Sequence, residues 1–177
     1  MQILKIVVTG AYAAGKSQFI RTISDIEPVS TDYAVTLEEE RALKRETTVA
    51  LDFGTIAITD RLSLYLFGTP GQERFDFMWE HLSTGALGYV VMVDSCRPAH
   101  FAETQQLMAR FSEITDAPFV VAANKQDDQA ALPPAYIRRR LGIPAETPVL
   151  PCIATDRESV KQVLLALLRL IAARVQD

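Results

Sequence analysis

The sequence predicts an α/β protein in which helices cover both faces of a mostly parallel sheet. Apolar, strand-like runs alternate with helix-like patterns almost to the end of the chain, which is typical of parallel sheets. The 177 residues are enough for one domain with a substantial core. A content of 49% hydrophobic and 23% charged residues is that of a globular protein. We therefore expect one domain over residues 1–177, with its ligand at the carboxyl ends of the strands.

Each expected element has its own signal in the sequence. An apolar, β-branched run and then a helix-like pattern open the chain, over residues 3–9 and 17–23. The turn Asp60-Arg61 separates two further runs, which we expect to pair as a hairpin over 49–58 and 62–67. The remaining signals predict strands over 87–94, 118–123 and 148–153 and helices over 101–114, 135–141 and 160–175. Residues 25–47 lack periodicity, and a loop of this length inside a domain is usually functional.

The net charge argues against one class of partner, and the sequences at the two ends of the chain argue against lipid anchors. A formal net charge of −4 argues against nucleic acid, because nucleic-acid binding needs a basic face. The sequence shows no signal peptide and no apolar run of membrane-spanning length. Gln2 stands where myristoylation requires glycine, and no cysteine box for prenylation closes the chain. We therefore expect a cytoplasmic protein without a membrane anchor of its own.

The stretch from Gly10 to Ser17 carries the most specific motif. It reads G-x-x-x-x-G-K-S and stands between the first strand and the first helix, an arrangement that binds phosphate. Backbone N–H groups of such a loop surround phosphate oxygens, and the helix adds its positive end. Lys16 supplies a charge for the β- and γ-phosphates, and the Ser17 hydroxyl suits Mg²⁺. The expected phosphate-binding residues are Gly10, Ala13, Ala14, Gly15, Lys16, Ser17 and Gln18.

The stretch Asn124-Lys125-Gln126-Asp127 follows a buried strand and indicates guanine rather than adenine. An aspartate carboxylate can accept both guanine N1–H and the exocyclic N2–H₂, a pair of donors that adenine lacks. Asp127 would make these bonds, while Lys125 would lay its stem along the base. Downstream, Ala154 and Thr155 follow the last strand, where a backbone N–H could meet guanine O6. The alternative interpretation of Asn124–Asp127 is a polar turn after a strand.

Two further stretches suit the γ-phosphate and the metal. Gly71 can bring its N–H to a γ-phosphate, and Gln72 can orient an attacking water. Thr48 ends the long loop just before a strand and could present its hydroxyl to Mg²⁺, with the adjacent Thr47 as the alternative. The expected metal ligands are therefore Ser17 and Thr48.

Taken in order, these motifs resemble those of the Ras-superfamily small GTPases, and residues 66–75 are most similar to the prokaryotic Ras-like branch. The resemblance covers essentially the whole chain. It implies the P-loop NTPase fold of a small G domain, with a six-stranded, mostly parallel sheet that contains one antiparallel strand. It also implies Mg²⁺, GTP and GDP as ligands, and switch segments at about 26–48 and 68–83. Regulatory or effector proteins would bind at these segments, and a prokaryotic relative would be expected to have a small roadblock-type partner.

The expected function is a molecular switch that binds Mg-GTP or GDP and slowly hydrolyses GTP. Gln72, Lys16 and Arg45 are the expected catalytic residues. Arg45 has the spacing to Thr48 at which G-protein α subunits carry a charge-stabilising arginine, although a solvated charge is the alternative. A GTP-dependent scaffold with negligible hydrolysis is the alternative function. A P-loop ATPase or kinase, with Asp94 as its acidic strand end, is a further alternative against which the guanine motif counts.

Three places depart from the family pattern or stand out. Gly68 replaces an aspartate that normally holds Mg²⁺ through water, so we expect weaker metal retention. Asp94 and Asp52 are possible substitutes, but a capping or turn role is the preferred interpretation of each. Tyr12 either projects over the γ-phosphate region or swings outward and packs on a switch. An aromatic set in the second switch either fills the core or binds a partner: Phe75, Phe77, Met78 and Trp79.

Overall fold

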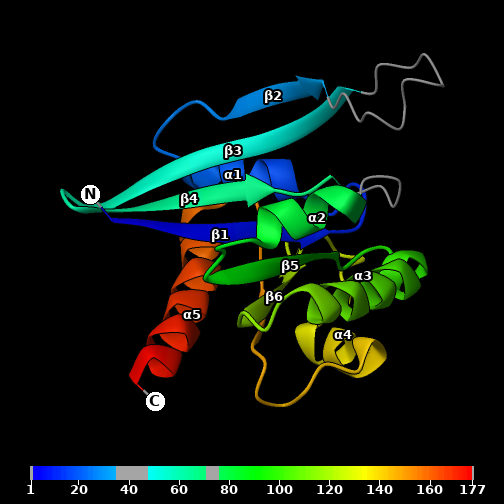
Figure 1. The fold of residues 1–177 in the computed structure, drawn as a ribbon. Coiled ribbons are helices and arrows are strands. Elements are labelled where there is room, and N and C mark those ends of the chain that lie inside the picture. The colour runs from blue at the N-terminus through cyan, green and yellow to red at the C-terminus, as the bar shows by residue number, and fades with distance from the viewer. Residues whose placement is uncertain (1, 35–47, 71–75, 177) are drawn as a thin grey trace.

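One mixed sheet organises the part of the chain that the computed structural model describes, residues 2–34, 48–70 and 76–176. Its seven strands run in the order β2-β3-β4-β1-β5-β6-β7 (Figure 1). Among these strands β3 alone runs in the opposite direction: its pairings with β2 and β4 are antiparallel, and the other four pairings are parallel. The strands are β1 (Gln2–Gly10), β2 (Val29–Ala34), β3 (Thr48–Thr59), β4 (Leu62–Gly68), β5 (Gly88–Asp94), β6 (Phe119–Asn124) and β7 (Val149–Pro151). The predicted α/β class, with one antiparallel strand in a mostly parallel sheet, is confirmed.

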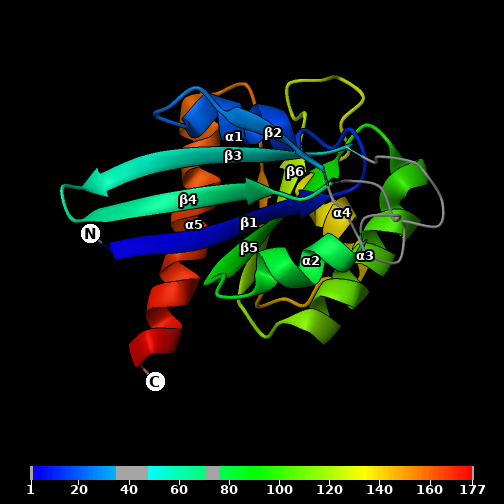
Figure 2. The ribbon, with the colours of Figure 1, turned by 45° about the horizontal axis from the view of Figure 1, so that its top comes forward.

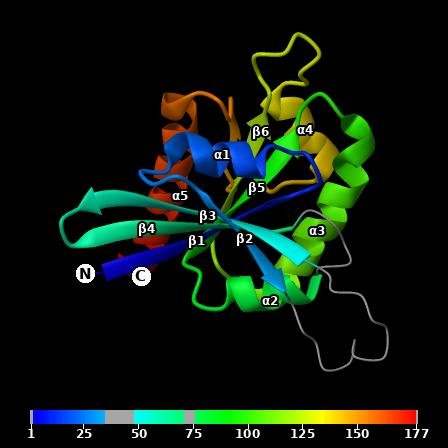
Figure 3. The ribbon, with the colours of Figure 1, turned by 90° about the horizontal axis from the view of Figure 1, so that it is seen from above.

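Helices cover both faces of the sheet, so the described part of the chain has two hydrophobic cores (Figures 1 and 3). Successive residues of β1 point to opposite faces. Ile6 and Val8 therefore join the core beneath α1 and α5, while Val7 joins the core beneath the other three helices. The α-helices are α1 (Lys16–Ile23), α2 (Asp76–Ser83), α3 (Phe101–Ile114), α4 (Pro134–Leu141) and α5 (Arg157–Gln176), and the short 3-10 helix η3 (Pro98–His100) directly precedes α3.

The sheet has one strand more than the six expected, because β2 forms within the stretch predicted to be a loop. Figure 2 shows β2 beside β3 at the edge of the sheet. Its pairing with β3 is antiparallel and runs from Val29↔Phe53 to Ala34↔Thr48. An edge strand is stabilised by the partner it pairs with more than by its own periodicity, which explains why the sequence pattern did not reveal it.

The carboxyl ends of the parallel strands bring distant parts of the sequence together. β1, β5 and β6 end at Gly10, Asp94 and Asn124, and the two registers β1/β5 and β5/β6 align these ends. The loops that leave these three strands therefore share one edge of the sheet (Figure 2). Across the described residues, every helix is too short or too polar to span a membrane.

Candidate functional site

The loop between β1 and α1 adopts a backbone that few sequences allow. Gly10, Ala13 and Gly15 have φ angles of 150°, 60° and 105°. A positive φ is uncommon for a residue with a side chain, so Ala13 marks a constrained turn. Such a turn directs successive N–H groups to the inside of the loop, where an anion can accept them.

The two motif glycines are also required by close packing. A Cβ at Gly10 would lie 2.4 Å from the carbonyl oxygen of Met92, on the neighbouring strand β5. A Cβ at Gly15 would lie 2.3 Å from Nδ2 of Asn124. Any larger residue would therefore push the loop away from the strand ends that support it.

Lys16 is held inside the loop with its charge poorly solvated. Its Nζ donates hydrogen bonds of 2.7 Å to the carbonyls of Gly10 and Ala11, and the residue is buried. This burial lowers the pKa of Lys16 to about 8, although the charges of Glu103 and Asp52 act in the opposite direction. An anion beside this ammonium would supply the charge that solvent does not.

A cavity of about 600 Å³ opens in front of the loop. Lys16 and Ser17 line it together with Tyr12, Gln18, Asp52 and Thr69. Tyr12 is 62% exposed, so it borders the cavity without being buried in it. Thr69 is buried and donates from Oγ1 to Oγ1 of Thr9 over 2.8 Å, which ties the start of the second predicted switch to β1.

The Ser17 hydroxyl donates a hydrogen bond to Oδ2 of Asp52. Asp52 lies within β3, directly opposite Gly68 of β4. Its carboxylate therefore approaches the phosphate-binding loop from the strand next to the one expected to carry an acid. The predicted capping or turn role of Asp52 is wrong, because this residue is inside a strand and contacts the loop serine.

Asn124 joins the phosphate-binding loop to the loops that follow β6 and β7. Its Nδ2 donates to the Ala14 carbonyl over 2.9 Å, and its Oδ1 accepts the Ala154 N–H over 2.9 Å. The side chain is buried, so both bonds are protected from water. The first residue of the Asn124–Asp127 stretch thus has a positioning role within the protein itself.

Lys125 and Asp94 form an ion pair of 2.6 Å. Asp94 is 2% exposed at its side chain and also accepts the Cys96 N–H over 3.0 Å, which agrees with the predicted turn role. Lys125 has a φ of 67°, a second positive angle at a residue with a side chain. Asp127 is exposed, and no described side chain hydrogen-bonds to it, so its carboxylate faces solvent.

The structure brings most of the predicted residues to one edge of the sheet, but not all are described. The N–H of Ala154 is already donated to Asn124, and the following Thr155 is exposed. Thr48 begins β3 and pairs with Ala34, but its side chain lies outside the described residues. Arg45, Gly71 and Gln72 lie outside them as well.

The aromatic set of the second predicted switch is core where the structure describes it. Met78 and Trp79 are 8% and 4% exposed and belong to the core beneath α2, α3 and α4. The ring of Trp79 lies 5.4 Å from that of Phe111. The core interpretation is therefore right for these two residues, and the side chains of Phe75 and Phe77 lie outside the described set.

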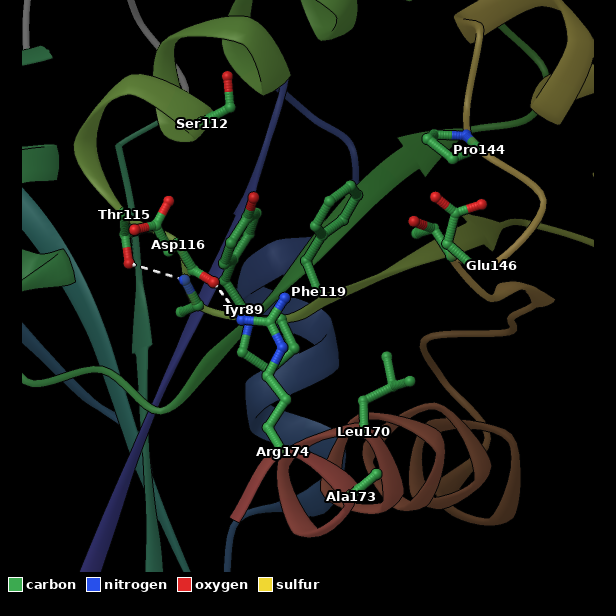
Figure 4. A pocket seen from close by; sticks show the side chains of 13 residues that line it. Tyr89, Ser112, Thr115, Asp116, Phe119, Pro144, Glu146, Leu170, Ala173 and Arg174 are labelled. Carbon is green, nitrogen blue, oxygen red and sulfur yellow. Dashed lines mark hydrogen bonds between the residues drawn. The ribbon is translucent and has the colours of Figure 1, made fainter. Parts of the chain in front are cut away.

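A second cavity, of about 480 Å³, lies at the other ends of the parallel strands, where β5 and β6 begin. Tyr89 stacks on Phe119 with ring centroids 4.9 Å apart, and Arg174 donates to the carbonyl of Asp116 (Figure 4). None of the motif residues lines this cavity. It is therefore separate from the phosphate-binding loop.

The strand, loop and helix around Lys16, at the carboxyl edge of a mostly parallel sheet, define a P-loop nucleotide-binding protein. Comparison with known families agrees with this class. The chain belongs to the family described as conserved hypothetical ATP binding proteins, whose sequence model matches residues 8–173.

The chain is also similar, at low identity, to individual proteins. It is 29% identical over 153 residues to ADP-ribosylation factor-like protein 4C of Homo sapiens, covering 82% of this chain and 74% of that protein. The Mus musculus protein of that name gives the same values. An uncharacterized protein of Methanocaldococcus jannaschii, MJ1339, is 27% identical over 124 residues, or 70% of this chain and 71% of that protein.

Proposed function

We propose that this protein is a guanine-nucleotide switch that binds GTP and GDP with Mg²⁺ and hydrolyses GTP slowly. The observation that carries the proposal is the double hydrogen bonding of Asn124, which couples the phosphate-binding loop to the stretch that ends at Asp127. The free carboxylate of Asp127 is suited to the paired N–H donors of guanine. The similarity to ADP-ribosylation factor-like protein 4C, together with the small-GTPase resemblance of the motifs, supports the same ligand.

The proposed phosphate-binding and catalytic residues would act mainly by stabilising the negative charge of the nucleotide phosphates. Lys16 would attract the β- and γ-phosphates, and the N–H groups from Ala13 to Gln18 would surround them. Gly71 would contact the γ-phosphate, and Gln72 would orient water. Arg45 would stabilise the charge that develops during transfer.

The donors present fit magnesium, which is bound by few protein ligands and keeps several waters. Ser17 offers a hydroxyl and Asp52 a carboxylate at one wall of the cavity, and Thr48 is the proposed third contributor. When bound, Mg²⁺ would neutralise charge on the phosphates.

The output of the switch would be the arrangement of residues 26–48 and 68–83 in response to the γ-phosphate. Regulatory or effector proteins would bind there, among them a roadblock-type partner. The whole chain, residues 1–177, would act as one domain in this role.

Adenine nucleotide is the second candidate ligand, because the family description names ATP. Competition distinguishes the two. We expect unlabelled GTP, but not ATP at similar concentration, to displace a fluorescent GDP analogue from the protein. Equal displacement by ATP would contradict guanine specificity.

Hydrolysis distinguishes the switch from a GTP-dependent scaffold. The test is single-turnover hydrolysis by the purified protein with excess Mg²⁺. A rate on the order of 10⁻² s⁻¹ would support built-in catalysis, as in proteins with an arginine in cis. A rate of roughly 10⁻⁴ s⁻¹ or below with GTP still bound would favour a scaffold or a requirement for an activating partner.

A further inference from the structure

We infer that Asp52, carried by β3, is the carboxylate that retains magnesium at Ser17, and that position 68 is glycine in order to leave room for it. This inference rests on the proposed function, because it concerns the metal that would accompany the nucleotide. It replaces the expectation of weak metal retention that follows from Gly68 alone.

The pairing of β3 with β4 places the acid over the glycine. Asp52 and Gly68 are partners in the antiparallel ladder, so their side chains point to the same face of the sheet. A Cβ added at Gly68 would lie 3.1 Å from Cβ of Asp52 and 3.4 Å from its Oδ2. The Asp52 side chain therefore occupies space that a side chain from position 68 would enter.

The hydrogen bond from Ser17 gives this carboxylate a defined relation to the metal position. A hydroxyl that donates its hydrogen to a carboxylate keeps its oxygen lone pairs available for a cation. Removal of a carboxylate that orients a metal ligand in this way typically lowers metal affinity by roughly 10–100-fold. The negative charge at the cavity wall adds attraction for a divalent cation.

Packing of β3 against α1 fixes the approach of Asp52. Gly54 lies two residues further along the strand, on the same face. A Cβ there would be 2.7 Å from Cγ2 of Ile20 and 3.0 Å from Cβ of Ser24. The strand thus lies so close to the helix that begins with Lys16 and Ser17 that the short aspartate side chain reaches the serine.

Asp94, the other acid considered as a substitute, is already paired with Lys125. Its Oδ2 is 2.6 Å from Nζ of Lys125, and its Oδ1 accepts the Cys96 N–H. It does not line the cavity in front of the phosphate-binding loop. Of the two acids considered as substitutes for the missing aspartate, only Asp52 contacts a predicted metal ligand.

The decisive experiment measures how nucleotide release depends on Mg²⁺. Protein loaded with a fluorescent GDP analogue is mixed with excess GDP at a series of free Mg²⁺ concentrations. For Asp52→Asn, we expect the half-saturating Mg²⁺ concentration to rise by roughly 10–100-fold, with little change of the release rate in excess EDTA. The control is Glu146→Gln, an exposed acid at the second cavity, which should behave as wild type.

A relocated carboxylate provides the complementary test. In Asp52→Gly/Gly68→Asp the acid moves across the ladder. The substitution at position 52 removes two of the three close neighbours of the new Cβ, and the third, Cδ1 of Ile20 at 3.1 Å, is the end of a side chain that can shift. We expect this variant to recover most of the Mg²⁺ affinity lost in Asp52→Asn. Circular dichroism and thermal unfolding establish that each variant is folded, and if the double variant does not fold, Asp52→Asn alone decides.

An unchanged half-saturating Mg²⁺ concentration in Asp52→Asn would overturn the inference. Failure of the proposed function would look different, because wild-type protein would then bind no guanine nucleotide with or without Mg²⁺. In that case the same titration with a fluorescent ADP analogue tests Asp52 independently of the base.

Discussion

The side-chain amide of Asn124 donates to the carbonyl of Ala14 across 110 positions of sequence, over 2.9 Å. Through this bond and the one to Ala154, a single buried residue holds together three loops at the edge of the sheet. The geometry of the candidate site therefore depends on an amide that need not touch the ligand.

Replacing Asn124 with alanine should destabilise the ligand-free protein. The buried Ala14 carbonyl and Ala154 N–H would lose their partners, and we expect the free energy of unfolding to fall by roughly 2 kcal/mol or more. Urea denaturation measures this loss. Gln105→Ala removes an exposed side-chain bond to the Arg140 carbonyl and should cost less than about 0.5 kcal/mol. Equal effects of the two substitutions would contradict the role given to Asn124.

Gly15→Ala should damage the site beyond the cost of its backbone angle. The added methyl would meet Nδ2 of Asn124 at 2.3 Å, at a φ of 105°. We expect nucleotide affinity to fall at least about tenfold, or 1.4 kcal/mol, as measured by equilibrium titration.

Gly85→Ala is the matched control for this substitution. Gly85 has a φ of 72° but no atom within 4 Å of an added Cβ. It should cost about 1 kcal/mol of stability and leave nucleotide affinity unchanged. An equal loss of affinity in both variants would show that steric contact with Asn124 is not the cause.

Nucleotide affinity should decrease as the pH rises above about 8. Burial lowers the pKa of Lys16 to about 8, whereas a phosphate beside the ammonium would raise it again. Binding therefore takes up a proton at alkaline pH, and affinity falls by up to about tenfold per pH unit above 8. Calorimetry at pH 7, 8 and 9 in buffers of different ionisation enthalpy measures both effects.

The same group has the opposite effect on the protein without ligand. The unfolded chain holds the lysine proton up to a pKa of 10.5, so it binds more protons than the folded chain between pH 8 and 10.5. The contribution of Lys16 to the free energy of unfolding therefore rises with pH in that interval. Lys16→Arg keeps its charge throughout, and its residual affinity should not depend on proton uptake by this side chain.

Asp127→Asn should change the preferred base. The asparagine amide can donate to the C2 carbonyl of xanthine, but it no longer accepts both guanine donors. We expect GTP affinity to fall by about 100-fold or more and xanthosine triphosphate to bind better than GTP. Asp128→Asn, one residue away, removes the charge of an exposed carboxylate but keeps an oxygen that can accept the Ala130 N–H, and it is the control. Unchanged GTP affinity in Asp127→Asn would contradict base recognition by this carboxylate.

Arg45→Ala should slow single-turnover GTP hydrolysis by at least about tenfold if Arg45 stabilises the transition state in cis. Nucleotide affinity should change much less, because the charge it would meet develops during transfer. Lys44→Ala, which removes the neighbouring charge, is the control. An unchanged rate, with and without partners, would assign Arg45 to the solvated surface.

The sequence predicted the central strands and most helices because their patterns are local. The predicted helix over 101–114 coincides with α3, and the run over 62–67 differs from β4 by one residue. β2 was not predicted because its stability comes from pairing with β3. The short final strand was predicted over 148–153 but covers Val149–Pro151, where pairing with β6 ends.

The same contrast holds for the candidate site: its parts with a local sequence motif were predicted, and its contacts that depend on strand pairing were not. The phosphate-binding loop and Asn124 could be recognised from their order along the chain. The contact between Asp52 and Ser17 could not, because it depends on which residue of β3 lies opposite Gly68. The Asp94–Lys125 pair was also unforeseen, because residues 31 apart meet only when β5 and β6 align.

The hairpin between β3 and β4 contains an irregularity that determines which residue of β3 lies opposite Gly68, at the proposed metal site. Thr59 pairs with Leu62 while Ala57 pairs with Ser63, so the β3 side carries one extra residue. If the ladder continued without this bulge, Phe53 would lie opposite Gly68 and the Asp52 carboxylate would point to the other face of the sheet. The end of a hairpin usually tolerates the insertion of a residue. Here, a shift of the β3/β4 register by one residue would replace the acid with an aromatic ring at the phosphate-binding loop.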